Sequence, residues 1–245
     1  MSKAALIENL EDALDEAHAF PDDGWPEAVN CAAGTVPVWT YFLDSEFHRS
    51  MHLMHARMQS HLRDGWIPVI GTSIEQAMDV TQIHPACVNM GIAGDTTRGV
   101  LWRIKQPPLD GTGFTQSTWE AAPVFPAFTR AGAVILEPST NDAGSEAIAN
   151  QEITLDRLFA FFTGPLVVVS CIPHTTPATI DAVNGLLAAR CSGRANTVFV
   201  NITTALRGSN NYLNPAYGIG DPVHLNAAGY GVVIPLIRAG LESVL

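Results

Sequence analysis

The segment WIPVIGTSIE, residues 66–75, contains the features that decide the fold of this chain. Ile67–Gly71 is a short, continuously apolar run, which is typical of a β-strand covered on both faces. The glycine at its end permits a sharp turn that places the Ser73 hydroxyl at the start of a helix. A strand that leads directly into a helix is the repeating unit of α/β proteins.

The same alternation of apolar strands and helices continues to the C-terminus. Further strands are predicted at residues 86–90, 133–137, 166–172 and 197–202. Helices are predicted at residues 97–105, 154–162, 177–191 and from 226 to the end. This pattern indicates a parallel sheet with helices on both faces, in which ligands bind beyond the carboxyl ends of the strands.

Residues 1–65 have a different character, and we expect them to form an N-terminal helical extension packed on a main domain of residues 66–245. The second helix of this extension carries His48, His52 and His55 along one flank. Imidazoles at this spacing could chelate a metal, but no nearby Asp, Glu or Cys completes a site. A half-exposed helix flank is the preferred interpretation, and neither a metal nor a cofactor is expected.

Composition excludes several classes of protein. The 245 residues are 47% hydrophobic and 15% charged, which is too apolar for a disordered chain. Thirteen Lys and Arg against 24 Asp and Glu give a net charge of −11, so a nucleic acid is not an expected partner.

The start of the chain and the cysteines indicate the compartment. The first helix is acidic where a signal peptide would be apolar, and no apolar run is long enough to span a bilayer. Four widely separated cysteines without CxxC spacing predict reduced, mostly buried thiols. We therefore expect a cytoplasmic protein without a membrane partner.

Chemistry-bearing residues follow the predicted strands, and each alone has an ordinary explanation. Ser73 could be a simple helix N-cap, and Asn141 a residue of an Asx turn. The glycine-rich segment that contains Gly94 lacks the lysine of a P-loop and the third glycine of a dinucleotide turn. Before the last helix, Asp221 and His224 are three residues apart, so the carboxylate can accept a hydrogen bond from the imidazole and fix its tautomer.

Taken in order, these residues resemble those of the SGNH (GDSL-type) hydrolase family. The resemblance runs from about residue 66 to the end, and is strongest in NMGIAGDTT (89–97) and DPVHLNAAGYG (221–231). It implies a three-layer α/β/α sandwich with a five-stranded parallel sheet, of the flavodoxin-like type.

The resemblance also implies a role for each residue. Ser73 would be the nucleophile, His224 its general base, and Asp221 the group that orients His224. The backbone N–H groups of Ser73 and Gly94 and the side-chain amide of Asn141 would form the oxyanion hole. Two blocks depart from the family pattern: GDS reads Gly71-Thr72-Ser73, which removes a carboxylate beside the nucleophile, and GxND reads Ser139-Thr140-Asn141-Asp142.

The predicted function is that of a serine esterase acting on a small-molecule ester, with short acyl groups on a sugar or small alcohol as the expected substrates. A thioesterase or acyltransferase would use the same residues. A ligand-binding module that has kept the fold without catalysis is the other alternative, motivated by the altered GTS block.

Overall fold

The structure is a computed structural model of the chain. It describes residues 63–95, 100, 104, 126–138, 140–141, 155–156, 159–160, 162–174 and 176–245. The chain divides into two compact units, residues 1–62 with 102–127 and residues 63–101 with 128–245. The predicted N-terminal helical extension, with its three histidines, lies outside the described residues. The architecture below is that of the second unit.

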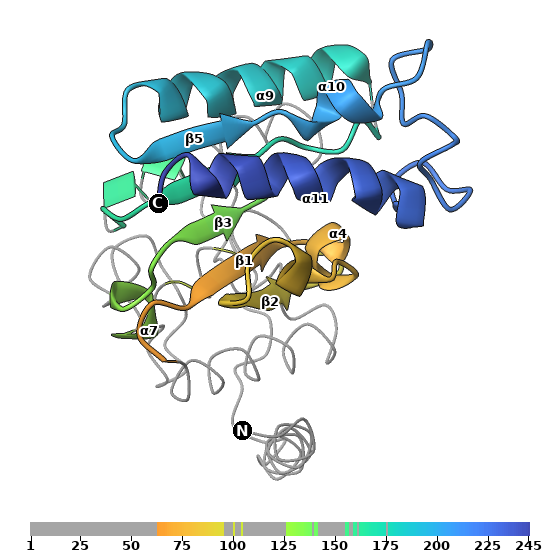
Figure 1. The fold of residues 1–245 in the computed structure, drawn as a ribbon. Helices are drawn as coiled ribbons and strands as arrows, with labels where there is room; N and C mark the ends of the chain where they lie inside the picture. Colours follow the sequence, from red (N-terminus) through yellow and green to blue (C-terminus); the bar gives the residue numbers. More distant parts are fainter. Residues whose placement is uncertain are drawn as a thin grey trace, which may run out of the picture. The chain divides into compact units, whose positions relative to one another are not determined.

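Five strands form one parallel sheet, which confirms the predicted α/β fold. The strands are β1 (Ile67–Gly71), β2 (Cys87–Gly91), β3 (Val134–Leu136), β4 (Leu166–Val169) and β5 (Thr197–Val200). Their order in the sheet is β2-β1-β3-β4-β5, as the ribbon in Figure 1 shows. After β1 the chain forms β2 on one side and then β3 on the other. The carboxyl ends of β1 and β3 therefore flank the point where α/β proteins bind ligands.

The sequence of the strands explains their place in the middle of the domain. β1, β3 and β4 are buried at every residue, and their apolar side chains leave no polar face for solvent. The predicted bounds of β1 are confirmed, and those of β2 and β3 differ by one residue at each end. The strand predicted at 166–172 ends earlier, at Val169. Its ladder stops because the Cys171 N–H donates to Asn184 Oδ1 at 3.1 Å instead of to a strand.

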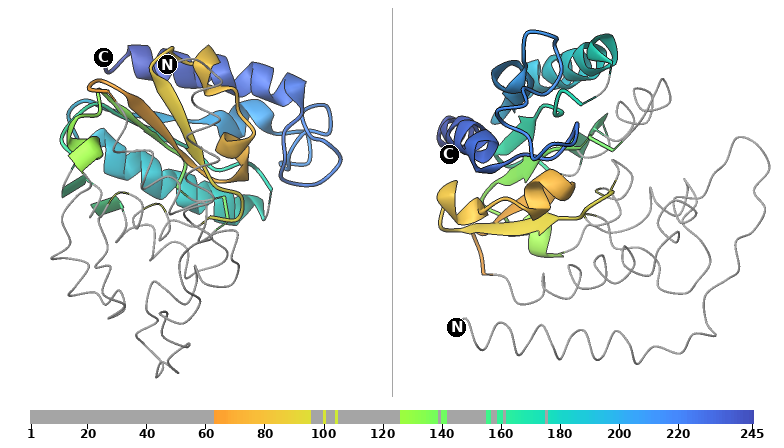
Figure 2. Two further views of the ribbon diagram at one scale, coloured as in Figure 1. Left: turned by 90° about the horizontal axis from the view of Figure 1, so that it is seen from below. Right: turned by 90° about the vertical axis from the view of Figure 1, so that its right-hand side faces the viewer.

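Two long helices cover opposite faces of the sheet (Figure 2). α9 (Pro177–Ser192) begins with a proline, whose missing N–H costs nothing at a helix start. α11 (Ala227–Glu242) begins after Asn226, whose side chain accepts from the Gly229 N–H at 3.0 Å. Both helices lie where they were predicted, but α9 ends one residue later than expected and α11 ends at Glu242 instead of at the last residue. The helices predicted at 97–105 and 154–162 lie largely outside the described residues. The shorter helices are α4 (Ser73–Gln76), η1 (Val80–Gln82), α7 (Pro126–Thr129) and α10 (Ile202–Leu206).

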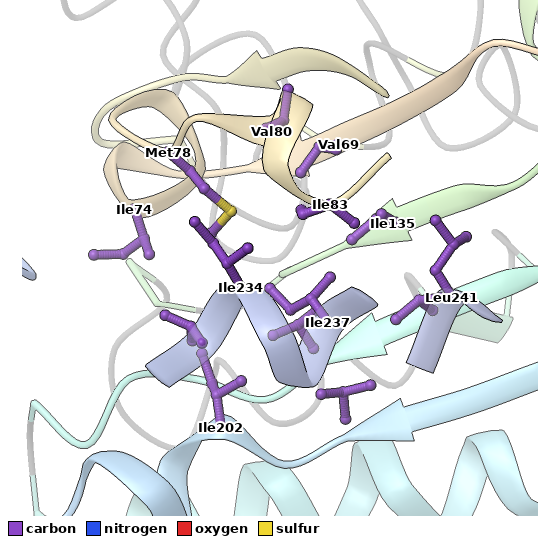
Figure 3. Close-up of a cluster of buried hydrophobic side chains, with 14 of the residues drawn as sticks. Val69, Ile74, Met78, Val80, Ile83, Ile135, Ile202, Ile234, Ile237 and Leu241 are labelled. Carbon is purple, nitrogen blue, oxygen red and sulfur yellow. The ribbon is translucent and has the colours of Figure 1, made fainter. Parts of the chain in front are cut away.

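The core between α11 and the sheet fixes the position of the elements that carry the site. Figure 3 shows Ile234, Ile237 and Leu241 of α11 beside Val69 and Ile135 of the sheet. All five belong to one buried apolar cluster. Full burial of such a side chain stabilises the fold by roughly 1.5–3 kcal/mol. The same cluster includes Ile74 of α4, and the Tyr230 hydroxyl of α11 donates to the Ile74 carbonyl at 2.9 Å. This bond ties the helix that begins with Ser73 to α11.

Cys87, Cys171 and Cys191 are buried, as predicted for these three, and Cys31 lies outside the described residues. Among the helices that the structure describes, none is both long and apolar enough to span a membrane.

Candidate active site

The site residues lie on loops that leave the same edge of the sheet. Gly71 of β1 is level with Gly91 of β2, and Ile70 of β1 is level with Leu136 of β3. The chain segments that follow these three strands therefore start side by side. They carry Ser73, Gly94 and Asn141, and the sequence analysis predicted all three as site residues.

Ser73 is held at the start of α4 by a reciprocal cap. Thr72 is the N-cap residue, and its hydroxyl accepts from the Ile74 N–H at 3.4 Å. In return, Glu75 Oε2 accepts from the Thr72 N–H at 2.8 Å, which completes a capping box. A Cβ atom on Gly71 would lie 2.1 Å from Glu75 Oε2, so only glycine leaves room for the folded-back glutamate. This packing fixes the turn that presents the Ser73 hydroxyl.

A chain of hydrogen bonds joins Ser73, His224 and Asp221. His224 Nε2 is 3.0 Å from Ser73 Oγ, and His224 Nδ1 is 2.8 Å from Asp221 Oδ2. A carboxylate only accepts hydrogen bonds, so Nδ1 carries the imidazole proton. Nε2 is then left to accept from the Ser73 hydroxyl. The structure thus brings the three predicted catalytic residues together in the order that base-assisted attack by a serine requires.

Asp221 is organised by the turn that carries it. Its Oδ1 accepts from the backbone N–H groups of Val223, at 2.9 Å, and of His224, at 2.7 Å. These bonds and the imidazole lower the pKa of Asp221 to about 2. Asp221 is therefore ionised across the physiological pH range and available to orient His224.

The loop around His224 is tied to the domain on both sides. The Ile219 N–H donates to the His224 carbonyl at 3.1 Å. The Asn226 side chain donates to the carbonyls of Ala216, at 3.0 Å, and Gly218, at 2.9 Å. Leu225 is buried in the core cluster directly after the histidine. These contacts hold an exposed imidazole in one place without a helix or strand.

Gly94 and Asn141 belong to two loops that are bonded to each other. Gly94 has φ +76°, a conformation that favours glycine, in a turn closed by the Asp95 N–H on the Ile92 carbonyl at 3.1 Å. The Asn141 side-chain amide donates to the Asp95 carbonyl at 2.9 Å. An amide NH₂ has two hydrogens, so one remains for a ligand.

Sequence reasoning missed a buried acidic pair beside the turn that presents Ser73. Glu75 and Glu137 are 2% and 0% exposed, and one oxygen of each lies 3.4 Å from Thr72 Oγ1. Thr72 replaces the aspartate of the family pattern, and two carboxyl groups from other positions in the chain lie beside it. The T-x-x-E spacing of Thr72 and Glu75 was a readable signal for the cap, whereas Glu137 is placed there only by strand pairing.

Two remaining expectations have different outcomes. Thr140, one of the departures from the family's GxND pattern, is buried at 2% exposure, while Ser139 lies outside the described residues. The histidine-bearing helix also lies outside them. Within the described part of the chain, no group of three or more His, Cys, Asp or Glu could hold a metal ion.

Comparison with known proteins gives a match in structure but not in sequence. No family model matches the chain, and no curated protein matches it. Among solved structures, the chain is similar to a candidate platelet activating factor from Streptococcus pneumonia, with a TM-score of 0.62 and 18% identity over 83% of this chain and 96% of the other.

Two further solved structures carry names that describe a hydrolase. A GDSL-like lipase from Bacteroides thetaiotaomicron matches with a TM-score of 0.59 and 18% identity over 79% of this chain and 98% of the other. An acetylxylan esterase from Geobacillus stearothermophilus matches with a TM-score of 0.52 and 16% identity over 72% of this chain and 94% of the other. At these identities the comparison confirms the predicted resemblance to SGNH (GDSL-type) hydrolases at the level of the fold.

Proposed function

We propose that the protein is a serine hydrolase that cleaves carboxylic esters through a covalent acyl-serine intermediate. The observation that carries this proposal is the hydrogen-bond chain from Asp221 through His224 to Ser73 Oγ. A serine hydroxyl is a weak nucleophile at neutral pH and needs an adjacent base. The family name of the GDSL-like lipase that shares the fold points to the same chemistry.

The steps follow from the protonation states that the geometry favours. His224 Nε2 takes the Ser73 proton as Oγ attacks the ester carbonyl carbon. The carbonyl oxygen becomes an oxyanion, which the N–H groups of Ser73 and Gly94 and the second hydrogen of the Asn141 amide would stabilise. Collapse of this intermediate breaks the bond to the alcohol, which leaves with the proton from His224. Water then repeats the sequence on the acyl-serine and releases the acid.

The Ser73 and Gly94 N–H groups are suited to this role. Ser73 is the first residue of α4, where a backbone N–H has no intrahelical acceptor. Within the described part of the chain, no protein group accepts from either N–H. Both donors and the positive end of the helix therefore remain available to a developing negative charge.

We further propose short acyl esters of a sugar or small alcohol as the substrates. The support is the acetylxylan esterase among the solved structures with this fold, whose name specifies an acetyl ester of a polysaccharide. Chromogenic esters of increasing acyl length test the pocket directly, and we expect the acetyl ester to have the highest kcat/KM. A preference for long acyl chains would contradict this part of the proposal.

Substitution of the nucleophile tests the mechanism. Ser73→Ala should abolish hydrolysis of the preferred ester, with a loss on the order of 10⁴-fold or more. Its melting temperature should stay close to that of the wild type, because removal of a partly exposed hydroxyl leaves no large cavity. Ser192→Ala, at the exposed end of α9, is the matched control and should keep full activity. Wild-type rates in Ser73→Ala would reject the assigned nucleophile.

A further inference from the structure

Gln76 connects the helix that begins with Ser73 to the loop that carries Gly94. It is the last residue of α4, and its side-chain oxygen Oε1 accepts from the Ala93 N–H at 2.8 Å. Ser73 and Gln76 are three residues apart on one helical turn, so they lie on the same side of it. The Gln76 side chain thus joins the two elements that supply the N–H groups proposed for the oxyanion hole.

The backbone of Gln76 is fixed by its own contacts, so its side chain reaches the loop from a defined position. Its N–H donates to the Thr72 carbonyl at 3.0 Å, and its carbonyl accepts from the Asn89 amide of β2 at 3.2 Å. A Cβ atom on Gly91, the last residue of β2, would lie 2.1 Å from the Gln76 nitrogen. The end of β2 therefore packs directly on the backbone of α4 (Figure 1).

The loop after β2 is held on both sides of Gly94. On one side, Gln76 accepts from the Ala93 N–H. On the other side, the Asn141 amide donates to the Asp95 carbonyl at 2.9 Å. Gly94 itself has φ +76° and no Cβ atom that could restrain it by packing. The position of its N–H therefore depends on the contacts that its neighbours make.

We propose that Gln76 is a positioning residue for the proposed oxyanion hole and sets the spacing between the N–H groups of Ser73 and Gly94. This inference rests on the proposed function for its effect on catalysis, but not for the contact between Gln76 and the loop. Oxyanion donors must lie about 2.7–3.1 Å from the oxyanion, and a displacement of about 1 Å can lower a rate a hundredfold. Because the two donors belong to different elements, a side chain that joins these elements controls their spacing.

The chemistry of glutamine suits this position. The Ala93 N–H needs an acceptor, and the amide of Gln76 offers a carbonyl oxygen without net charge. A glutamate at this position could also accept, but its negative charge would oppose the charge that develops on the ester oxygen. A neutral acceptor fixes the loop without this repulsion.

Gln76→Met tests the role by kinetics. Methionine is close to glutamine in length and helix propensity, but its thioether is only a weak acceptor. With the preferred short-acyl ester, kcat should fall about tenfold or more while KM stays within about twofold, because the donors act on charge present mainly in the transition state. Gln82→Met is the matched control. Gln82 is exposed in η1, where its amide donates to Asp79 Oδ2 at 3.0 Å, and its loss should leave kcat unchanged.

A trifluoromethyl ketone separates a positioning role from a general loss of stability. Ser73 Oγ adds to its carbonyl carbon, His224 takes the proton, and the carbonyl oxygen becomes an oxyanion. The inhibition constant should rise in Gln76→Met by about the same factor as kcat falls, and should keep its wild-type value in Gln82→Met. The melting temperatures of both variants should stay within a few degrees of the wild type.

Two kinetic outcomes would overturn the positioning role. One is a Gln76→Met variant whose kcat and inhibition constant equal those of the wild type. The other is a raised KM with unchanged kcat, because Gln76 would then contribute equally to ground-state and transition-state binding. If Gln76→Met does not fold, Gln76→Ala removes the same acceptor and is measured in its place.

Amide hydrogen exchange tests the contact without any substrate. The Ala93 N–H should exchange several-fold faster in Gln76→Met than in the wild type, and at the wild-type rate in Gln82→Met. Equal exchange in Gln76→Met and the wild type would overturn the contact. Faster exchange in a protein that hydrolyses no ester would reject the proposed function, and with it the role in catalysis, while the contact between Gln76 and the loop would stand.

Discussion

The side-chain amide of Asn141 has two uses in this structure that a single substitution can separate. One hydrogen goes to the Asp95 carbonyl at 2.9 Å, which joins the loops after β2 and β3. The other is available to an oxyanion. If Asn141 is only a turn residue, its amide makes the bond to Asp95 and stabilises the fold. If Asn141 is also an oxyanion donor, its second hydrogen stabilises the transition state.

Asn141→Ala should therefore lower kcat on the order of a hundredfold or more and leave KM nearly unchanged. The loss of the bond to Asp95 should cost about 1 kcal/mol of unfolding free energy. Kinetics and thermal melting of the same sample measure both effects.

Asn184→Ala is the control for this substitution. Its amide bonds Thr203 Oγ1 at 2.7 Å and the Cys171 N–H at 3.1 Å, in a buried network between β4, α9 and α10. This variant should melt earlier and keep its kcat. A kcat for Asn141→Ala within a few-fold of the wild type would remove Asn141 from the oxyanion hole, given the size of the effect expected there.

At the scale of elements, α11 links the core to the site. Its buried face packs on the sheet and on α4, while the residue next to Ile237 points outward: Ile237 is 1% exposed and Leu236 is 37% exposed. Ile237→Ala should reduce the unfolding free energy by about 2–5 kcal/mol, because it leaves a cavity in the core. Leu236→Ala removes a similar side chain from the surface and should change the unfolding free energy by no more than about 0.5 kcal/mol. Denaturant titration compares the two, and equal losses would contradict the packing described for α11.

The elements also show how far sequence reasoning reaches. Apolar runs such as residues 67–71 define strands by local composition, and glycine at the strand end together with the Asp221–His224 spacing indicates the candidate catalytic residues. The predicted end of β4 was wrong because the Cys171 N–H donates to the side chain of Asn184, which belongs to another element. Glu137 was missed for the same reason. A glutamate is normally exposed, and only the parallel pairing of β3 with β1 brings it to Thr72.

At the scale of the whole domain, the site exists only when distant parts of the chain are assembled. Ser73 and His224 are 151 residues apart, and the sheet, α4 and α11 must all be in place for their hydrogen bond to form. The loop that carries His224 is exposed, but buried Leu213 and Leu225 anchor it on either side. The Leu213 N–H also donates to the Pro173 carbonyl at 2.7 Å, after β4. This anchoring predicts that the loop unfolds with the domain rather than before it.

A serine-directed fluorophosphonate reports on this assembly, because only a base-activated serine reacts rapidly. In increasing urea, labelling of Ser73 should disappear at the same midpoint as the loss of far-UV circular dichroism. Peptide mapping identifies the labelled residue, and Ser73→Ala provides the blank. Loss of labelling at a clearly lower urea concentration, with the dichroism intact, would show that the His224 loop opens as a separate unit. The contacts of Leu213 and Leu225 would then be too weak to couple the position of His224 to the stability of the sheet.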